Sequence, residues 1–292
     1  MKKVILCPNP HRDHELRAAK QAKTILEECG FQTAVCLPFY TDENTETYGL
    51  SVAPLQQELR EAEMLIAFGG DGTILHLAKN TAVRDVPILG VNLGSLGLMA
   101  ELEQNELVRL RELRDGKFTT EERMMLDISV VREGRVIYSN AALNEAVVTK
   151  GAVSRIIRLS ILTEQGRLLD VSGDGVIVAT PTGSTGYSLS AGGPVVEPTA
   201  ENIIISPICA HSIHANSYVL SSKRSVTVRT GSTGRKQVYL SVDGGRAFLL
   251  RSGDEVMVVK SQHVTRLIRL SNKNFCDILA KKMLPGGLNN EN

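Results

Sequence analysis

A strand-like run of apolar residues that leads directly into a glycine-rich turn constrains the fold of this chain more than any other feature. The run, Met64–Phe68, carries no charged side chain, and Gly-Gly-Asp-Gly-Thr follows it at residues 69–73. Strands without polar alternation usually lie in parallel sheets whose two faces are both covered. With a helix expected from Ile74 to Asn80, the sequence predicts a strand–turn–helix unit of an α/β sheet.

The first 122 residues repeat this alternation of strands and helices. Further strands are expected at Lys3–Cys7, Gln32–Leu37 and Val86–Val91, and further helices at Asp13–Cys29 and Leu55–Ala62. Alternating strands and helices are typical of open parallel sheets with helices on both faces. We therefore predict a doubly wound, mostly parallel α/β domain over residues 1–122.

The middle of the chain changes to short strands separated by glycine-containing turns. Leu126–Glu133, a turn at Gly134 and Val136–Asn140 resemble a β-hairpin, and similar runs continue to Leu270. This pattern predicts a β-rich domain over residues 123–272. The last segment, 273–292, contains an amphipathic helix that is expected to pack back on the first domain.

The turn at residues 69–73 has the composition of a phosphate-binding loop. Gly70 and Gly72 let the backbone approach a ligand closely, and the helix that follows offers unpaired N–H groups to a phosphate. Asp71 is expected at the carboxyl end of a strand, where open α/β sheets bind ligands. Its carboxylate could orient a hydroxyl, accept the proton of that hydroxyl or help to hold Mg²⁺. The alternative is a tight turn in which Asp71 only caps the helix.

His76 and Arg155 are candidate contacts for phosphate groups. His76 follows Asp71 in the first turns of the expected helix, where a packed or solvated histidine is the alternative. Arg155 follows the strand that contains Asn144 and Glu145, and a plain surface arginine is its alternative. Asn144 and Glu145 are adjacent, so a strand end or bulge is needed to aim both at one ligand.

A second glycine-rich and hydroxyl-rich loop begins after the expected strand 175–180, with Asp174 just before that strand. Hydroxyls and backbone amides can bind adenine, ribose and diphosphate groups without carrying net charge, and Tyr187 adds a flat amphipathic face. A flexible linker is the alternative, but the preceding strand and the stiff Pro181 argue against it. The candidate binding residues in this loop are Thr182, Thr185, Gly186, Tyr187, Ser188 and Ser190.

These motifs together resemble a known family of kinases. GGDGT after an apolar strand resembles the superfamily that joins NAD kinases, diacylglycerol-type lipid kinases and 6-phosphofructokinases. The stretch 174–187 is similar to the NAD kinase signature D-G-x-x-x-x-T-P-T-G-S-T-A-Y, with Gly186 in place of the usual Ala. Residues 92–99 resemble N-x-G-x-x-G-F-L. Residues 206–212 resemble T-P-I-C-P-H-S, with Ser206 and Ala210 as departures, and Asp243-Gly244-Gly245 resembles D-G-Q, with Gly245 as a departure. The motifs occur in the family's order over about residues 1–285.

The resemblance implies an enzyme that phosphorylates the 2′-hydroxyl of the adenosine ribose of NAD with ATP. It implies an α/β domain, a β-rich domain and a homodimer or homotetramer. Asp71 would be the general base, Asn144 and Glu145 would hold ribose hydroxyls or the adenosine, and Asp174 would complete the NAD site, from its own or a neighbouring subunit. Thr182, Thr185, Tyr187 and Ser190 would line the adenine and diphosphate, and Mg²⁺ is expected as the companion of ATP.

Composition limits the other classes of function. A net charge of +1 gives no whole-chain argument for binding nucleic acid or an anionic membrane. No apolar run is long enough for a signal peptide or a membrane span, and five cysteines without a C-x-x-C pair favour free thiols, so a cytoplasmic location is predicted. The pairs His11/His14 and His211/His214 lack a partner at a familiar zinc spacing, so no metal-ligating residue is assigned. The rival functions are a lipid kinase, which needs an apolar acceptor pocket, and a non-catalytic NAD(P)-sensing module, which has no use for Asp71.

Overall fold

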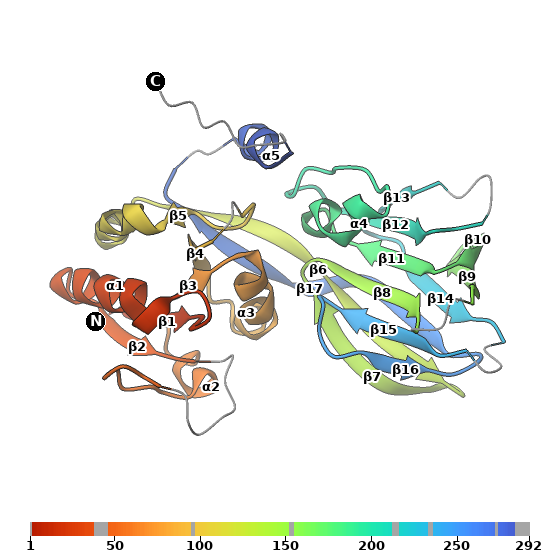
Figure 1. Cartoon of the computed structure of the whole chain (residues 1–292), viewed down its shortest axis with the longest axis horizontal. Coiled ribbons are helices and arrows are strands. Elements are labelled where there is room, and N and C mark those ends of the chain that lie inside the picture. Colours follow the sequence, from red (N-terminus) through yellow and green to blue (C-terminus); the bar gives the residue numbers. More distant parts are fainter. Residues whose placement is uncertain are drawn as a thin grey trace. The chain divides into compact units, whose positions relative to one another are not determined.

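The computed structural model describes residues 2–37, 46–94, 97–151, 155–211, 216–232, 236–271 and 274–283. The chain divides into two compact units (Figure 1). The first unit combines Met1–Glu122 with Thr265–Asn292, and the second unit is Arg123–Val264. The division at 122/123 lies inside strand β6 (Thr119–Arg132), and the return at 264/265 lies inside strand β17 (Glu255–Arg269) rather than at residue 272.

The first unit is built on a parallel sheet. Its strands follow the order β4 (Ile88–Asn92), β3 (Met64–Gly69), β1 (Lys3–Pro8) and β2 (Gln32–Val35), and all neighbours in this order are parallel. Every residue of β3 and β4 is buried, as the unbroken apolar runs predict. The short strand β5 (Leu102–Glu103) and the end of β17 both pair with β4.

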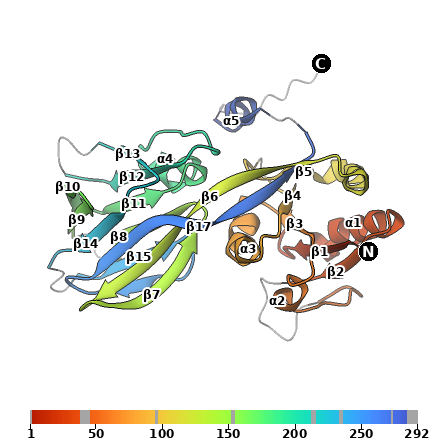
Figure 2. The ribbon, with the colours of Figure 1, turned by 180° about the vertical axis from the view of Figure 1, so that it is seen from behind.

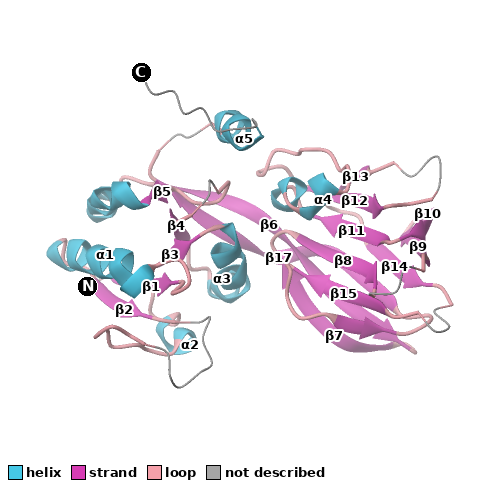
Figure 3. Cartoon of the chain, viewed as in Figure 1, coloured by secondary structure: helices cyan, strands magenta, loops and turns pink. Residues whose placement is uncertain are grey.

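Helices cover this sheet (Figure 3). They are η1 (His14–Leu16), α1 (Arg17–Glu28), α2 (Leu55–Glu58), α3 (Asp71–Arg84) and the 3₁₀ helix η2 (Gln104–Asp115). The first long helix was expected from Asp13, but α1 begins at Arg17. The carboxylate of Asp13 accepts hydrogen bonds from the N–H groups of Ala18 and Ala19 at 2.9 and 3.0 Å, so it caps the helix from outside while Glu15 and Leu16 take positive φ angles.

The direction of winding reverses between β1 and β3. From β1 the chain moves to β2 on one side, and it then returns to β3 and β4 on the other side. The carboxyl ends of β1 and β3 therefore face a topological switch point, which is where open α/β sheets bind ligands. GGDGT directly follows β3 and lies at this point.

The second unit contains two antiparallel sheets. One has the order β13, β12, β11, β8, β15, β16, and the other has β10, β9, β14 and β17, with β6 paired to β17 and to β7. The bounds of the strands not yet given are β7 (Arg135–Ala142), β8 (Glu145–Lys150), β9 (Ile157–Thr163), β10 (Gly166–Gly173), β11 (Gly175–Ala179), β12 (Asn202–Ile208), β13 (Tyr218–Ser221), β14 (Val226–Thr230), β15 (Val238–Val242) and β16 (Phe248–Leu250). The predicted hairpin over residues 126–140 is the β6–β7 pair.

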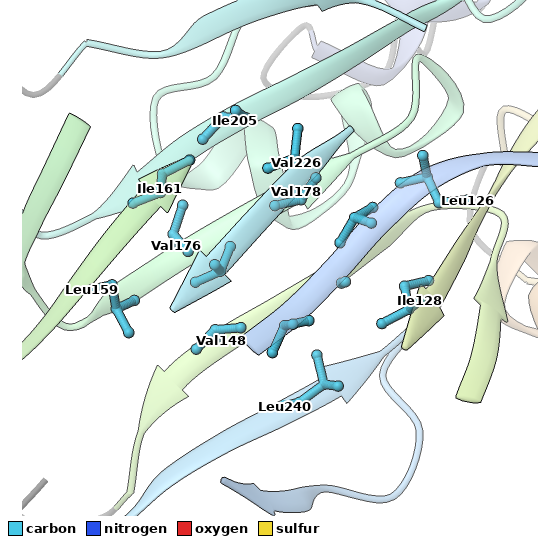
Figure 4. Close-up of a cluster of buried hydrophobic side chains, with 14 of the residues drawn as sticks. Leu126, Ile128, Val148, Leu159, Ile161, Val176, Val178, Ile205, Val226 and Leu240 are labelled. Carbon is cyan, nitrogen blue, oxygen red and sulfur yellow. The ribbon is translucent and has the colours of Figure 1, made fainter. Parts of the chain in front are cut away.

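The core of the second unit lies between these sheets (Figure 4). Alternate residues of each strand enter it, such as Val148 of β8, Val176 of β11 and Val226 of β14. The opposite face of β8 and β11 carries Val147 and Ile177, which pack in a smaller cluster with residues after the short helices η3 (Thr182–Thr185) and α4 (Tyr187–Ser190). The segment that contains η3 and α4 is thus anchored on a rigid sheet.

The helix α5 (Phe275–Met283) follows β17 near the end of the chain (Figure 2). Its residues up to Ala280 are exposed or half-buried. None of the helices in the described ranges combines the length and apolar composition that crossing a bilayer requires. An α/β unit with a mainly parallel sheet, a β-rich unit and a C-terminal helix confirm the predicted fold class.

Candidate active site

The GGDGT turn is tied to the loop that follows β1. Asn9, the first residue after β1, donates its backbone N–H to the carbonyl of Phe68 at 2.9 Å, and its side-chain amide donates to the hydroxyl of Thr73 at 3.3 Å. A side chain on Gly69 would overlap the hydroxyl of Thr73. The two loops at the switch point therefore form one packed structure.

Asp71 begins helix α3, and the backbone of another loop fixes its carboxylate. The carboxylate oxygens accept hydrogen bonds from the N–H groups of Leu98 and Met99 at 2.9 and 3.1 Å. Gly97 leaves room for this approach, since a Cβ there would lie 2.5 Å from Asp71 Oδ1. The Asp71 side chain is thus held by residues 97–99, which are the described end of the motif at residues 92–99.

Gly70 and Gly72 lie beside open space. A Cβ added to either residue would meet no atom within 4 Å. Gly70 is the N-cap of α3, and no side chain caps this helix end. The N-terminal end of a helix attracts anionic groups, so this open end of α3 suits one. His76 is exposed on the same helix.

In the second unit, Asn144 and Glu145 lie at the turn where β8 begins. Three consecutive N–H groups, those of Leu143, Asn144 and Glu145, donate to the carboxylate of Asp243 at 2.7, 2.9 and 2.9 Å. The carbonyl of Glu145 accepts a hydrogen bond from the N–H of Asp243 at 3.0 Å. Asn144 and Glu145 thus lie at a strand end, the arrangement that adjacent side chains need if both are to reach one ligand.

The side chains of Asn144 and Glu145 retain unused acceptors. Asn144 Oδ1 and Glu145 Oε2 are buried and have no hydrogen-bond partner among the described residues. Burial, together with the negative charge of Asp243, raises the pKa of Glu145 to about 7. Buried polar atoms are rarely left unpaired, so these two oxygens are candidate acceptors for the donor groups of a ligand.

The loop after β11 packs directly on this turn. Thr180 donates its hydroxyl to the carbonyl of Leu143 at 2.6 Å and its N–H to the carbonyl of Asn144 at 2.8 Å. A Cβ on Gly183 would overlap the carbonyl of Asn144, so this contact requires glycine. A Cβ on Gly186 would lie 3.3 Å from Glu145 Oε2 and 3.5 Å from Asn144 Nδ2. Gly186 therefore leaves slightly more room beside the unpaired oxygens than the usual Ala.

The hydroxyl-bearing residues of this loop differ in exposure. Tyr187 is 45% exposed, Ser190 is exposed, and Thr185 is half-buried with its hydroxyl donating to the carbonyl of Thr182 at 3.3 Å. Thr182 is buried and accepts a hydrogen bond from the guanidinium of Arg123 at 3.4 Å. Ser188 is fully buried and shares a hydrogen bond with Ser206 at 2.9 Å, so its hydroxyl supports the loop.

Asp174 and Arg155 do not lie with these residues. In the β8–β11 pairing, Gly175 lies opposite Thr149 and Ala179 lies opposite Glu145, so Asp174 is at the other end of β11. There its carboxylate forms an ion pair with Lys150 at 2.7 Å. Arg155 is exposed and precedes β9, four residues beyond Gly151 at this same end of β8. Within one copy of the chain, the predicted site residues of the second unit therefore form two groups, one at each end of β11.

The match to known sequences and structures covers almost the whole chain. The sequence model of the ATP-NAD kinase N-terminal domain matches residues 4–113, and that of the ATP-NAD kinase C-terminal domain matches residues 143–270. The NAD kinase of Natranaerobius thermophilus is 39% identical over 98% of this chain and 99% of its own, and that of Geobacter sulfurreducens is 44% identical over 76% and 78%. The chain belongs to the NAD kinase family. It is therefore an enzyme of the kinase class.

Solved structures of NAD kinases share this fold. Yeast NADH kinase complexed with NADH superposes with a TM-score of 0.85 at 25% identity, covering 100% of this chain and 89% of its own. The NAD kinase from Archaeoglobus fulgidus in complex with ATP gives a TM-score of 0.72 at 24% identity, covering 96% and 98%. The predicted family resemblance is confirmed over both halves of the chain.

Two residues that organise the candidate site were not assigned from the sequence. Asn9 connects the β1 loop to GGDGT, and Asp243 holds the turn at Asn144 and Glu145. The Asn-Pro pair after an apolar strand and the Asp-Gly-Gly turn are the signals that mark them. No group of three or more His, Cys, Asp or Glu residues suited to a metal ion occurs within the described ranges.

Proposed function

We propose that this member of the NAD kinase family transfers the γ-phosphoryl group of ATP to the 2′-hydroxyl of the adenosine ribose of NAD, which yields NADP and ADP. The observation that carries the proposal is the pair of buried, unpaired oxygens on Asn144 and Glu145. Ribose hydroxyls and the adenine amino group are donors of the kind that such oxygens accept.

The acceptor side of the reaction is assigned to the second unit. Glu145 and Asn144 bind hydroxyl or amino groups of the adenosine, and the loop with Thr185, Tyr187 and Ser190 lines the rest of the nucleotide. No residue from Thr182 to Ser190 is charged, and this suits a neutral adenosine. The complex of yeast NADH kinase with NADH supports a nicotinamide nucleotide as the ligand.

The donor side is assigned to GGDGT. The open backbone at Gly70 and Gly72 and the uncapped start of α3 support binding of a phosphate chain. Asp71 is proposed as the general base: the 2′-oxygen attacks the γ-phosphorus, its proton passes to the Asp71 carboxylate, and the bond to the β–γ bridging oxygen of ATP breaks. The hydrogen bonds from Leu98 and Met99 orient this carboxylate.

Mg²⁺ is proposed to enter with ATP. Mg²⁺ in phosphoryl transfer is usually held by one or two carboxylates and by the phosphates themselves, so a dedicated cluster of protein ligands is not required. When bound, the ion neutralises the charge that develops on the phosphate oxygens.

A homodimer or homotetramer is part of the proposal. Asp174 lies at the opposite end of β11 from Glu145, and this separation supports an Asp174 that acts on the NAD bound by a partner subunit. Arg155, at the end of the unit that holds Asp174, would then reach a phosphate group of that ligand. A cytoplasmic location, in which the five free cysteines stay reduced, also belongs to the proposal.

The experiment is an incubation of the purified protein with ATP and Mg²⁺ and either NAD or a diacylglycerol. NADP formation is read with an NADP-specific dehydrogenase, and ³¹P NMR distinguishes the 2′-phosphate from a 3′-phosphate. A phosphorylated lipid would instead support the lipid-kinase alternative. NAD binding without NADP would support the sensing module.

A further inference from the structure

The carboxylate of Asp243 has an unusual set of partners. Its Oδ1 accepts hydrogen bonds from the N–H groups of Asn144 and Glu145, and its Oδ2 accepts one from Leu143. The three residues are consecutive, and they lie about a hundred positions earlier in the chain. Charge-assisted bonds of this kind are shorter and stronger than neutral ones.

The contact is built by the strands on either side. The β8–β15 pairing ends with Ala146 opposite Val242, so the residues just beyond it on each strand, Glu145 and Asp243, are adjacent. Asp243 takes a positive φ of 47°, which turns its carboxylate back toward the start of β8. A non-glycine residue rarely keeps such a backbone angle unless its surroundings stabilise it.

These bonds leave the Glu145 side chain without a partner for Oε2. Asp243 therefore fixes where the Glu145 and Asn144 side chains begin, while their unpaired oxygens stay available for a ligand. The cost of this arrangement is that two carboxyl groups lie close together in a buried place, which disfavours a negative charge on both.

We propose that Asp243 is a positioning residue of the NAD site, which holds the Asn144–Glu145 turn and makes NAD binding depend on the proton carried by Glu145. This rests on the proposed function, because it takes NAD as the ligand of that turn. Asp243 itself makes no contact with the ligand.

The sign of the pH dependence follows from the groups around Glu145. Burial and the charge of Asp243 raise the pKa of Glu145 to about 7. Among the described residues, Arg123 donates to Thr182 in the loop that packs on the turn, and the exposed Arg246 follows Asp243 by three positions. Above pH 7 the ionised Glu145 accepts hydrogen bonds from ribose hydroxyls. Below pH 7 it binds a proton, so NAD affinity falls.

The test is calorimetric titration of the full-length protein with NAD between about pH 5.5 and pH 8.5. For the wild type, the dissociation constant rises up to tenfold per pH unit below pH 7. Asp243→Asn removes the neighbouring charge but not the burial of Glu145, which is the larger cause, so the change moves part of the way to lower pH. Because the amide cannot accept all three N–H bonds, affinity at pH 8.5 also falls roughly tenfold or more.

Three further variants separate positioning from folding. Glu145→Gln gives an NAD affinity that does not depend on pH. Asp243→Glu weakens NAD binding but keeps the loss of affinity near pH 7. Asp170→Asn on β10 changes neither the affinity nor the pH at which it falls. A flat wild-type profile, or an Asp243→Asn profile that weakens without moving, would overturn the proposal. If Asp243→Asn does not fold, the wild-type and Glu145→Gln profiles decide. Absence of any NAD binding by the wild type would instead contradict the proposed function.

Discussion

The hydroxyl of Thr73 occupies the space that a side chain on Gly69 would need. A Cβ at position 69 would overlap Thr73 Oγ1 and lie 3.0 Å from Thr73 Cβ. The first and last residues of GGDGT therefore pack against each other, whereas Gly70 and Gly72 between them face open space. The glycines of one motif thus differ: Gly69 allows close packing, whereas Gly70 and Gly72 leave open space.

This division predicts different effects for different glycines. Gly69→Ala is expected to lower the free energy of unfolding by about 1–3 kcal/mol, the usual cost of overpacking. Gly70→Val and Gly72→Val are expected to abolish NADP formation while leaving the unfolding midpoint in urea near that of the wild type. Parallel loss of stability and activity at positions 70 and 72 would show that these glycines are structural.

Asp71→Asn is expected to lower kcat by at least ~10²-fold, the scale for a lost general base, while the NAD dissociation constant changes only a few-fold. Leu98 and Met99 donate to different oxygens of Asp71, so the amide keeps one of the two bonds, and its NAD affinity therefore tests whether the site stays in place. Steady-state kinetics and calorimetry together check this. Near-normal turnover would remove Asp71 from the proposed role.

Thr185→Val combined with Tyr187→Ala is expected to raise KM for NAD and to leave KM for ATP almost unchanged. Thr185 is half-buried and Tyr187 is 45% exposed, so both side chains can contact a ligand. Each lost hydrogen bond to a neutral ligand costs on the order of 1 kcal/mol, or several-fold in KM. Thr227→Val on β14 is the matched control. A rise in KM for ATP instead would assign this loop to the phosphate donor.

The separation of Asp174 from Glu145 predicts complementation between inactive variants. Asp174 and Thr180 flank β11, roughly 20 Å apart at about 3.3 Å per residue. If Asp174 acts on a partner's NAD site, Glu145→Gln and Asp174→Asn are each defective alone. Mixed and allowed to exchange subunits, they should regain roughly a quarter of wild-type activity, because a mixed dimer contains one intact site. No recovery despite proven exchange would place both residues in one subunit's site.

Glu145→Gln is expected to stabilise the ligand-free protein at pH 8 and to have a smaller effect at pH 5. The folded-state pKa of Glu145 is raised to about 7, so folding becomes less favourable as pH rises through that value. The stabilisation by Glu145→Gln, measured as the free energy of unfolding, is expected to be larger at pH 8 than at pH 5 by an amount on the order of 2 kcal/mol. Urea unfolding at both pH values measures it, with the exposed Glu197→Gln as control. An equal effect at both pH values would contradict a raised pKa.

Much of the α/β unit followed from apolar runs alone. Strand β3 was predicted as Met64–Phe68 and extends one residue further, to Gly69, which pairs with Asn92 of β4. Helix α3 was predicted from Ile74 but begins at Asp71. Glycines lower helix propensity, yet Gly72 lies in the first turn of α3, where the backbone geometry of the GGDGT turn decides the start. The helix η2 was missed, although Leu107, Leu110 and Leu113 recur every three residues.

The candidate site was predictable only in part. GGDGT and the loop after β11 are local motifs, and their residues are neighbours in the sequence. The contact of Asp243 with the Asn144–Glu145 turn depends on the β8–β15 pairing, which joins segments far apart in the chain. Such pairing is set by tertiary packing, so no local pattern indicates that three amides meet one carboxylate. The separation of Asp174 from Glu145 likewise could be recognised only from the register of β11 against β8.

The last strand of the chain completes the first unit, and this orders events during synthesis. Leu267 of β17 pairs with Ile88, Ile268 enters the core of that unit, and Glu101 accepts hydrogen bonds from Leu270 and Ser271. A ribosome adds roughly 5–20 residues per second, so the sheet of the first unit lacks these residues until synthesis reaches them. The contiguous second unit can already fold during that time. The part made first is thus expected to finish last, and early termination before Thr265 would leave Ile88 and Glu101 without these partners.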